Sequence, residues 1–148
     1  MYQVKDAMSS EVVSIRPDVT IEAAIRILLE HNVSGAPVMD DGRLYGIISQ
    51  FQMLEVIYDP AVKDLRVQDL MTSNVLSVEE SDLLGTAANM LIVHRIHRLP
   101  VMRGRKVVGI ISRSDLLRYI IKSGEKIDAF FEKLKTASTT ATEPMICT

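Results

Sequence analysis

The sequence repeats itself at an offset of 63 residues, and this duplication constrains the fold more than any single segment does. Residues 3–55 align with residues 66–118 without a gap and share 17 identities in 53 positions, whereas composition alone would give about three. Two copies are too few for a solenoid. We therefore predict two similar units that pack on each other across a pseudo-twofold axis.

Each copy has the pattern strand, helix, strand, strand, helix, so the predicted fold class is α+β with two βαββα units. Apolar residues recur with helical spacing from Ile21 in the first copy and from Leu84 in the second. Two short apolar runs follow, separated by a polar turn that contains glycine, which predicts a hairpin. The turns are expected at residues 40–43 and 103–105, and second helices at about residues 50–57 and 113–121.

The repeat also sets the predicted domain boundaries. They are a first domain at residues 1–57, a linker at 58–65, a second domain at 66–121, an amphipathic helix at 122–135 and a mobile tail at 136–148. The helix is predicted from apolar residues at i, i+3, i+4 and i+7, namely Ile127, Phe130, Phe131 and Leu134. Its apolar face either covers the protein's own core or a dimer interface, or it holds a protein partner. The tail is rich in Thr, Ser and Ala and has no periodicity.

Composition excludes several classes of protein. Hydrophobic residues make up 47% of the chain and charged residues 24%, with a net charge of −2, which is typical of a soluble globular protein and not of a disordered or fibrous one. The sequence has neither a long apolar run nor a secretory signal pattern, so we expect a cytoplasmic protein that does not bind membranes. The single cysteine, Cys147, excludes an internal disulfide and a cysteine-based metal site.

Three motifs recur in both copies: V-x-D-x-M in a segment expected to be extended, P-V-M in a strand, and G-I-I-S running into a helix. This arrangement resembles the cystathionine beta-synthase (CBS) domain, and two tandem copies resemble a Bateman module. The resemblance implies two units packed through their sheets with two ligand clefts between them. It also implies AMP, ADP or ATP as ligand, less often S-adenosylmethionine or NAD, with no obligatory cofactor and with assembly into a homodimer.

The second copy contains the full signature of nucleotide-binding CBS domains, G-h-x-[ST]-x-x-[DN], from Gly109 to Asp115. The resemblance implies that Ser112 lies near phosphate and that Asp115 binds the ribose hydroxyls. The alternative is a capping box, in which the same two residues only begin a helix. In the first copy Gln52 replaces the acid, so the cap is the better interpretation of Ser49 and Gln52, and the first site is weakened without being excluded.

Basic residues concentrate in the second copy. Residues 94–118 contain seven Arg or Lys against one acid, whereas residues 31–55 contain one Arg against three acids. A solvated basic face is the alternative interpretation. The resemblance implies that His97 and Arg98 approach the phosphates; in the first copy Ser34 and Gly35 stand in their places.

The remaining site residues come from the resemblance alone, which implies that Val33 and Ile96 flank adenine and that the backbone around Ser14 and Ser77 contacts the base edge. The complete predicted nucleotide-binding set is Ser14, Val33, Ser49, Ser77, Val78, Ile96, His97, Arg98, Pro100, Ser112 and Asp115.

No motif indicates catalysis or a metal site, so we do not expect an enzyme. The predicted function is an adenine-nucleotide sensor that regulates a protein partner, with its ligand mainly at the second repeat. The alternative is a dimeric interaction scaffold with incidental or no ligand. Nucleic-acid binding depends only on the basic stretch and is disfavoured by the sequence pI of about 5.9.

Overall fold

The structure is a computed structural model, and it describes residues 2–123. Contacts divide these residues into two units whose boundaries differ from those of the repeats. We call residues 13–75 the first-repeat unit, and residues 2–12 together with 76–123 the second-repeat unit. The predicted tail and the predicted C-terminal helix, beyond its first two residues, lie outside the described residues.

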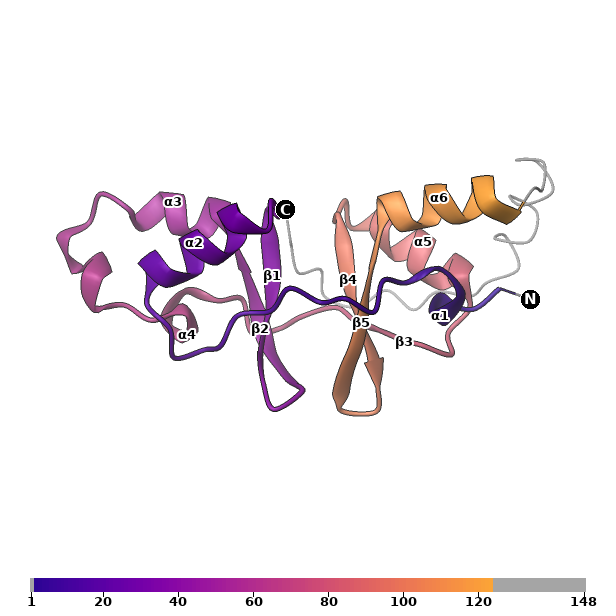
Figure 1. Cartoon of the computed structure of the whole chain (residues 1–148), viewed down its shortest axis with the longest axis horizontal. Coiled ribbons are helices and arrows are strands. Elements are labelled where there is room, and N and C mark those ends of the chain that lie inside the picture. Colours follow the sequence, from indigo (N-terminus) through magenta and orange to yellow (C-terminus); the bar gives the residue numbers. More distant parts are fainter. Residues whose placement is uncertain (1, 124–148) are drawn as a thin grey trace. The chain divides into compact units, whose positions relative to one another are not determined.

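The elements confirm an α+β fold with two tandem units (Figure 1). The first-repeat unit contains α2 (Ile21–Glu30), β1 (Gly35–Asp40), β2 (Arg43–Ser49), α3 (Gln50–Val56), the 3-10 helix η1 (Pro60–Asp64) and α4 (Val67–Leu70). The second-repeat unit contains α1 (Val4–Ala7), β3 (Val78–Glu79), α5 (Leu84–Val93), β4 (Arg98–Arg103), β5 (Lys106–Ser112) and α6 (Arg113–Ser123).

Local interactions mark the start of α2 and the turns that follow α2 and α5. The Thr20 hydroxyl accepts the Ala23 N–H at 3.1 Å and caps α2. Two residues beyond the last residue of α2 and of α5 the backbone is left-handed, at Asn32 with φ +53° and at Arg95 with φ +52°. After that turn the chain enters the central hairpin of its unit.

Each hairpin is antiparallel and closes at a tight turn. In the first-repeat unit, Asp41 and Gly42 both have positive φ, 52° and 77°, as two-residue hairpin turns require. In the second, Gly104 has φ 60°. A parallel strand completes each pattern: β3 pairs with β4, and its counterpart in the first repeat is a single bridge between Ile15 and Val38.

The V-x-D-x-M segments were predicted to be extended, and that prediction is wrong. They form the short helices α1 and α4. The cause is local, because the Asp6 carboxylate accepts the Gln3 N–H at 2.8 Å and the Asp69 carboxylate accepts the Arg66 N–H at 2.7 Å. Each aspartate therefore stabilises one helical turn.

These two short helices are exchanged between the repeats. Val4, from the first repeat, is fully buried in the hydrophobic core of the second-repeat unit, where α1 contacts α5 and α6 (Figure 1). Val67, from the second repeat, is fully buried in the core of the first-repeat unit. An edge-to-face contact between the rings of Tyr2 and Tyr119, with centroids 5.3 Å apart, adds to the first of these attachments. Each unit is thus completed by a segment from the other repeat.

Candidate functional site

The glycine of each G-I-I-S motif lets an exchanged segment approach a strand closely. A Cβ atom on Gly109 would lie 2.7 Å from the Ser9 carbonyl oxygen, and one on Gly46 would lie 2.6 Å from the Thr72 carbonyl oxygen. Next to these glycines the backbone of Ser9 pairs with that of Ile110 in β5, and the backbone of Thr72 pairs with that of Ile47 in β2. A side chain at either glycine would push the paired segments apart.

In the second-repeat unit, Ser112 and Asp115 form a complete capping box at the start of α6. The Ser112 hydroxyl accepts the Asp115 N–H at 3.1 Å, and the Asp115 carboxylate accepts the Ser112 N–H at 2.9 Å. The other carboxylate oxygen accepts a hydrogen bond from Arg118 at 3.0 Å. The capping interpretation is therefore correct as far as it goes, but carboxylate oxygens have further lone pairs with which to accept ligand hydroxyls.

In the first-repeat unit, Ser49 and Gln52 form the same capping box and Gln52 makes additional bonds. Its Oε1 accepts the Ser49 N–H at 2.9 Å. Its Nε2 donates to the Leu70 carbonyl oxygen at 3.2 Å and to the Thr72 hydroxyl at 2.9 Å. The predicted cap is confirmed, and the amide also holds the exchanged segment.

A cavity of about 380 Å³ lies in the second-repeat unit beside the start of α6. Its lining residues are Ser9, His97, Arg98, Ile110, Ser112, Arg113, Ser114 and Asp115. Two guanidinium groups and an imidazole therefore share this space with one carboxylate. The N-terminus of the 11-residue helix α6 adds backbone N–H groups and the positive end of its dipole. Together these groups can bind an anion next to a group that donates hydroxyl hydrogen bonds.

Arg113 is held in place from both ends. Its backbone N–H donates to the His97 carbonyl oxygen at 3.1 Å, and its Nε donates to the Ile96 carbonyl oxygen at 3.0 Å. Gln50 makes the corresponding two bonds in the first-repeat unit, to Ser34 and Val33. Both repeats thus make the same two hydrogen bonds at this position, but the residue that makes them is a cation, Arg113, only in the second copy.

The cavity brings together four predicted site residues, His97, Arg98, Ser112 and Asp115. The other predicted residues of this unit lie elsewhere: Ile96, Val78 and Pro100 are buried, and Ser77 is half-buried before β3. Ser14, Val33 and Ser49 belong to the first-repeat unit, where Ser49 is buried, Val33 half-buried and Ser14 exposed.

Four lining residues were not predicted: Ser9, Ile110, Arg113 and Ser114. The motif that contains Ser112 and Asp115 also contains Ile110, Arg113 and Ser114, so its position was the available signal. Ser9 had no such signal, because it reaches the cavity through the segment exchange.

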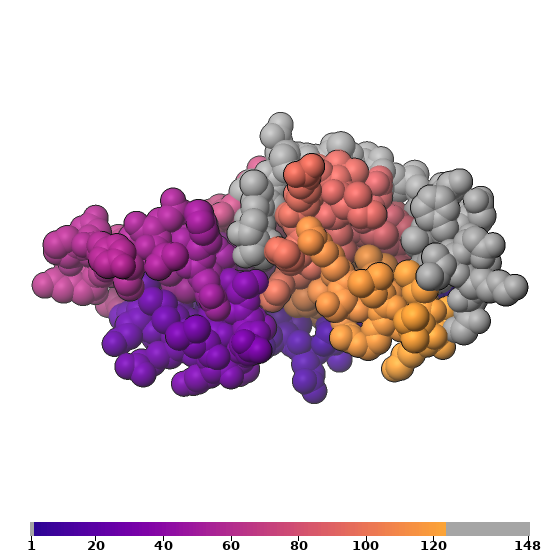
Figure 2. Space-filling model, turned by 90° about the horizontal axis from the view of Figure 1, so that it is seen from above, coloured from indigo at the N-terminus to yellow at the C-terminus, as the bar shows by residue number. Residues whose placement is uncertain are grey.

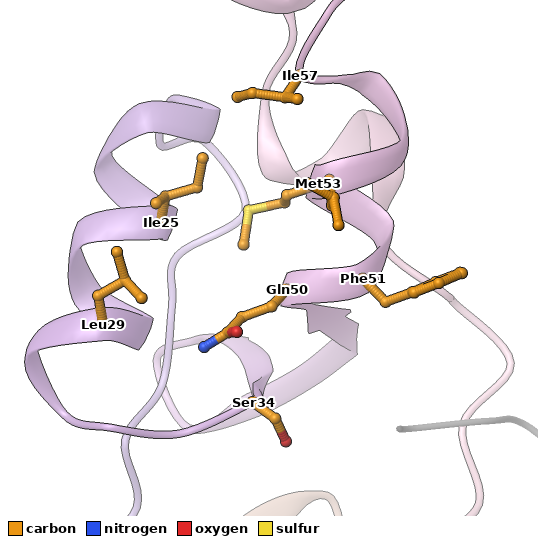
Figure 3. Close-up of a pocket in the computed structure, with 8 residues that line it drawn as sticks. Ile25, Leu29, Ser34, Gln50, Phe51, Met53 and Ile57 are labelled. Carbon is orange, nitrogen blue, oxygen red and sulfur yellow. The ribbon is translucent and has the colours of Figure 1, made fainter.

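A second cavity, of about 600 Å³, lies between α2 and α3 in the first-repeat unit and is mostly apolar. Ile25 and Leu29 of α2 point toward Met53 of α3, while Phe51 points away from α2 (Figure 3). Leu29 and Phe51 are largely exposed, 63% and 62%. This surface offers apolar contact and little polar chemistry.

Two features are absent from residues 2–123. No described helix combines the length and apolarity needed to cross a bilayer. Within the same residues, no group of three or more His, Cys, Asp or Glu side chains is placed to hold a metal ion.

Curated relatives match most of this chain. The CBS domain-containing protein YhcV of Bacillus subtilis is 29% identical over 117 residues, which cover 78% of this chain and 84% of that protein. The A-adding tRNA nucleotidyltransferase of Geobacter sulfurreducens is 33% identical over 115 residues, which cover 78% of this chain but only 13% of that protein. The chain thus spans most of one relative and a small part of the other.

Solved structures share the fold. CBSX2, crystallised in complex with AMP, has a TM-score of 0.76 and 30% identity, and the match covers 84% of this chain and all of that one (100%). The CBS domain pair of protein MJ0100, in complex with 5′-methylthioadenosine and S-adenosyl-L-methionine, has a TM-score of 0.70 and 26% identity, with coverage of 83% and 98%.

The family comparison agrees with the internal repeat. The CBS domain matches twice, at residues 4–59 and at residues 67–122. These two matches are offset by the same 63 residues as the repeat. The chain therefore belongs to the CBS domain family and carries two tandem copies of that domain.

Proposed function

We propose that this protein is a regulatory module that binds an adenine nucleotide, AMP, ADP or ATP, in the cavity of the second-repeat unit. The observation that carries the proposal is that His97, Arg98 and Arg113 line one cavity with Asp115 at the start of α6. The AMP complex of CBSX2 and the adenosyl ligands of the MJ0100 domain pair support an adenine-containing ligand. S-adenosylmethionine and NAD are the alternative ligands.

Each polar group has a proposed role. Arg98 and His97 donate to phosphate oxygens, because charge-assisted bonds from a guanidinium suit that group. The Ser112 hydroxyl adds a donor beside the α6 N-terminus. Asp115 accepts from the ribose hydroxyls with lone pairs that the cap leaves free. Val33 and Ile96, which the family resemblance implies for adenine, are not among the described residues that line this cavity.

The module acts by binding and catalyses no reaction itself. A ligand shifts the equilibrium between two arrangements of a protein only by the difference in its affinity for them. Nucleotide in the second-repeat unit would therefore regulate a protein partner by favouring the arrangement in which the cavity is better formed. We propose a cytoplasmic setting, where these nucleotides are present.

A thermal-shift and calorimetry panel tests the proposal with AMP, ADP, ATP, NAD and S-adenosylmethionine. A ligand at 100 times its Kd stabilises the folded protein by about 2.7 kcal/mol. Asp115→Ala should weaken binding more than Gln52→Ala, because the Asp115 carboxylate makes charge-assisted bonds to ribose, whereas the Gln52 amide is already bonded to Leu70 and Thr72. If none of the five compounds shifts the melting temperature, the interaction scaffold is the better function.

We further propose that the module is a homodimer, on the basis of apolar residues exposed at equivalent positions of both units. Leu29 of α2 and its equivalent Ile92 of α5 are 63% and 73% exposed. Leu54 of α3 and its equivalent Leu117 of α6 are 62% and 63% exposed. Helix α6 lies on the surface of its unit (orange in Figure 2). Because the apolar positions repeat between units, a second copy of the chain is a matched partner for them.

Light scattering tests the dimer. We expect a particle of twice the 16.5 kDa chain mass at micromolar concentration, and the double variant Leu54→Glu/Leu117→Glu should shift it to monomer. Glu55→Gln is the control, because this neighbouring exposed side chain is polar. A wild-type protein that is monomeric at that concentration would reject the dimer without affecting the nucleotide proposal.

A further inference from the structure

In each unit a helix follows the hairpin, α3 in the first-repeat unit and α6 in the second-repeat unit. The two units place different side chains between the start of this helix and the exchanged segment, which is the chain from the other repeat that contains Thr72 or Ser9. In the second-repeat unit that position has Asp115 on α6 and Ser9 on the exchanged segment. In the first-repeat unit it has Gln52 on α3 and Thr72 on the exchanged segment. The backbone pairing of the exchanged segment is the same in both units, Ser9 with Ile110 and Thr72 with Ile47. The side chains therefore decide whether a space is left between the helix and the exchanged segment.

Gln52 spans this space completely. Its Oε1 accepts from Ser49, and its Nε2 donates both to the Leu70 carbonyl oxygen at 3.2 Å and to the Thr72 hydroxyl at 2.9 Å. The protein itself therefore uses both donor hydrogens of the amide.

Asp115 does not span the corresponding space. It is one methylene shorter and has no N–H to donate, and its outer oxygen accepts from Arg118. The Ser9 hydroxyl donates within its own segment, to the Glu11 carbonyl oxygen at 3.5 Å. Within residues 2–123 no hydrogen bond joins Asp115 to Ser9, and both line the 380 Å³ cavity.

We infer that Gln52 is a built-in substitute for ligand, whose amide closes the first-repeat counterpart of the cavity to nucleotides, while Asp115 leaves the second-repeat cavity open. A ligand at the first-repeat position would have to break the bonds to Leu70 and Thr72, which lowers its affinity by about thirtyfold. This inference rests on the proposed function for the identity of the ligand. It does not rest on it for the bridge, by which we mean the bonds from the Gln52 amide to Leu70 and Thr72.

The test transfers the bridge to the open cavity. Asp115→Gln has the length and donors to reach Ser9 as Gln52 reaches Thr72, whereas Asp115→Asn is equally uncharged but too short. Both variants lose the carboxylate, so both should bind AMP more weakly than wild type does. We expect Asp115→Gln to lose about a further tenfold and to melt at a higher temperature than Asp115→Asn.

A second pair of variants separates the bridge from helix propensity, which also favours glutamine over asparagine. In a Ser9→Ala background the bridge loses its hydroxyl partner, so the differences between the Gln and Asn variants should shrink in both affinity and melting temperature. Equal affinities and equal melting temperatures for Asp115→Gln and Asp115→Asn with Ser9 intact would overturn the inference.

The reciprocal variant needs no ligand. Gln52→Asp should speed amide hydrogen exchange at Thr72 and Ile47, because the exchanged segment loses the two bonds from Nε2. Unchanged exchange at these amides would also count against the bridge. If wild-type protein binds none of the nucleotides, the proposed function fails, while the exchange and melting measurements still decide whether Gln52 holds the segment.

Discussion

Ser9 and Ile110 exchange both of their backbone hydrogen bonds, at 2.8 and 2.9 Å, although one lies in the first repeat and the other in the second. The pairing depends on the absence of a side chain at Gly109, where a Cβ would lie 2.7 Å from the Ser9 oxygen and 2.8 Å from the Met8 sulfur. One of the two obstacles is backbone, which cannot rotate away as a side chain can. The pairing also positions Ser9 in the wall of the cavity.

Gly109→Ala should therefore destabilise the protein by about 1–3 kcal/mol, the usual cost of inserting a group into a packed site. It should also weaken AMP binding, because Ser9 moves. Gly46→Ala is the matched control: its Cβ would lie 2.6 Å from the Thr72 oxygen, so stability should fall similarly while AMP affinity is retained. Urea unfolding and calorimetry measure the two effects. Wild-type stability in Gly109→Ala would show that the contact relaxes at no cost.

Arg98→Ala should cost on the order of 1.5–3 kcal/mol in affinity for AMP, the range for hydrogen bonds to charged groups, and should hardly change the affinity for adenosine. Arg105→Ala removes an exposed cation from the β4–β5 turn and is the control for net charge. Calorimetric titration of both ligands decides the matter. Equal losses for AMP and adenosine would mean that Arg98 shapes the cavity without contacting phosphate.

Arg95→Gly should stabilise the protein by about 1 kcal/mol, because Arg95 has φ +52° and a left-handed backbone strains any residue with a Cβ. The first repeat has Asn32 at this position, with φ +53°, and asparagine tolerates it better. Arg95→Asn should therefore give a smaller gain, and Asn32→Arg a loss. Chemical denaturation would contradict the strain argument if Arg95→Gly unfolded more easily than wild type.

Glu80 should contribute to the acid sensitivity of folding. Arg103 donates to both oxygens of its carboxylate, and this pairing lowers the pKa of Glu80 below its ordinary value of 4.5. A lowered folded-state pKa means that the contribution is complete above about pH 4.5 and is lost as the pH falls through the folded-state value.

Glu80→Gln should consequently unfold with a shallower dependence of free energy on pH in the acid range. Arg103→Met should have the same effect, and combining the two substitutions should add nothing. Urea unfolding at pH values from about 3 to 6 measures these slopes. A slope identical to wild type in both single variants would exclude a role for this pair.

Local signals predicted most of the fold. The two long helices and the hairpins follow from apolar spacing and turn chemistry, and the repeat placed them in register. The V-x-D-x-M segments were mistaken for extended chain because their helical turns depend on the Asp6 and Asp69 side chains bonding back to the backbone. The exchange of Val4 and Val67 between units left no mark on the sequence, because each is equally apolar in either core.

The predicted residues that line the cavity lie close together in the sequence, and the residue brought in from a distant part of the chain was not predicted. His97, Arg98, Ser112 and Asp115 lie in two short motifs of one repeat and do line one cavity. Ser9 escaped prediction because it comes from the opposite end of the described chain. The bond from Gln52 to Thr72 could not be predicted either, because a capping pattern accounts for the side-chain oxygen and does not reveal what Nε2 contacts.

The exchanged segments have a consequence for how such a protein could arise. In this protein the N-terminal segment of each repeat is buried in the core of the other repeat's unit. A chain with only one repeat would have such a segment but no second repeat to supply the segment that its own core needs. The contacts made by Val4 and Val67 inside one molecule would then require two molecules that trade their first turns. Fusion of two such genes would turn a reciprocal swap between subunits into an intramolecular one and remove its dependence on concentration.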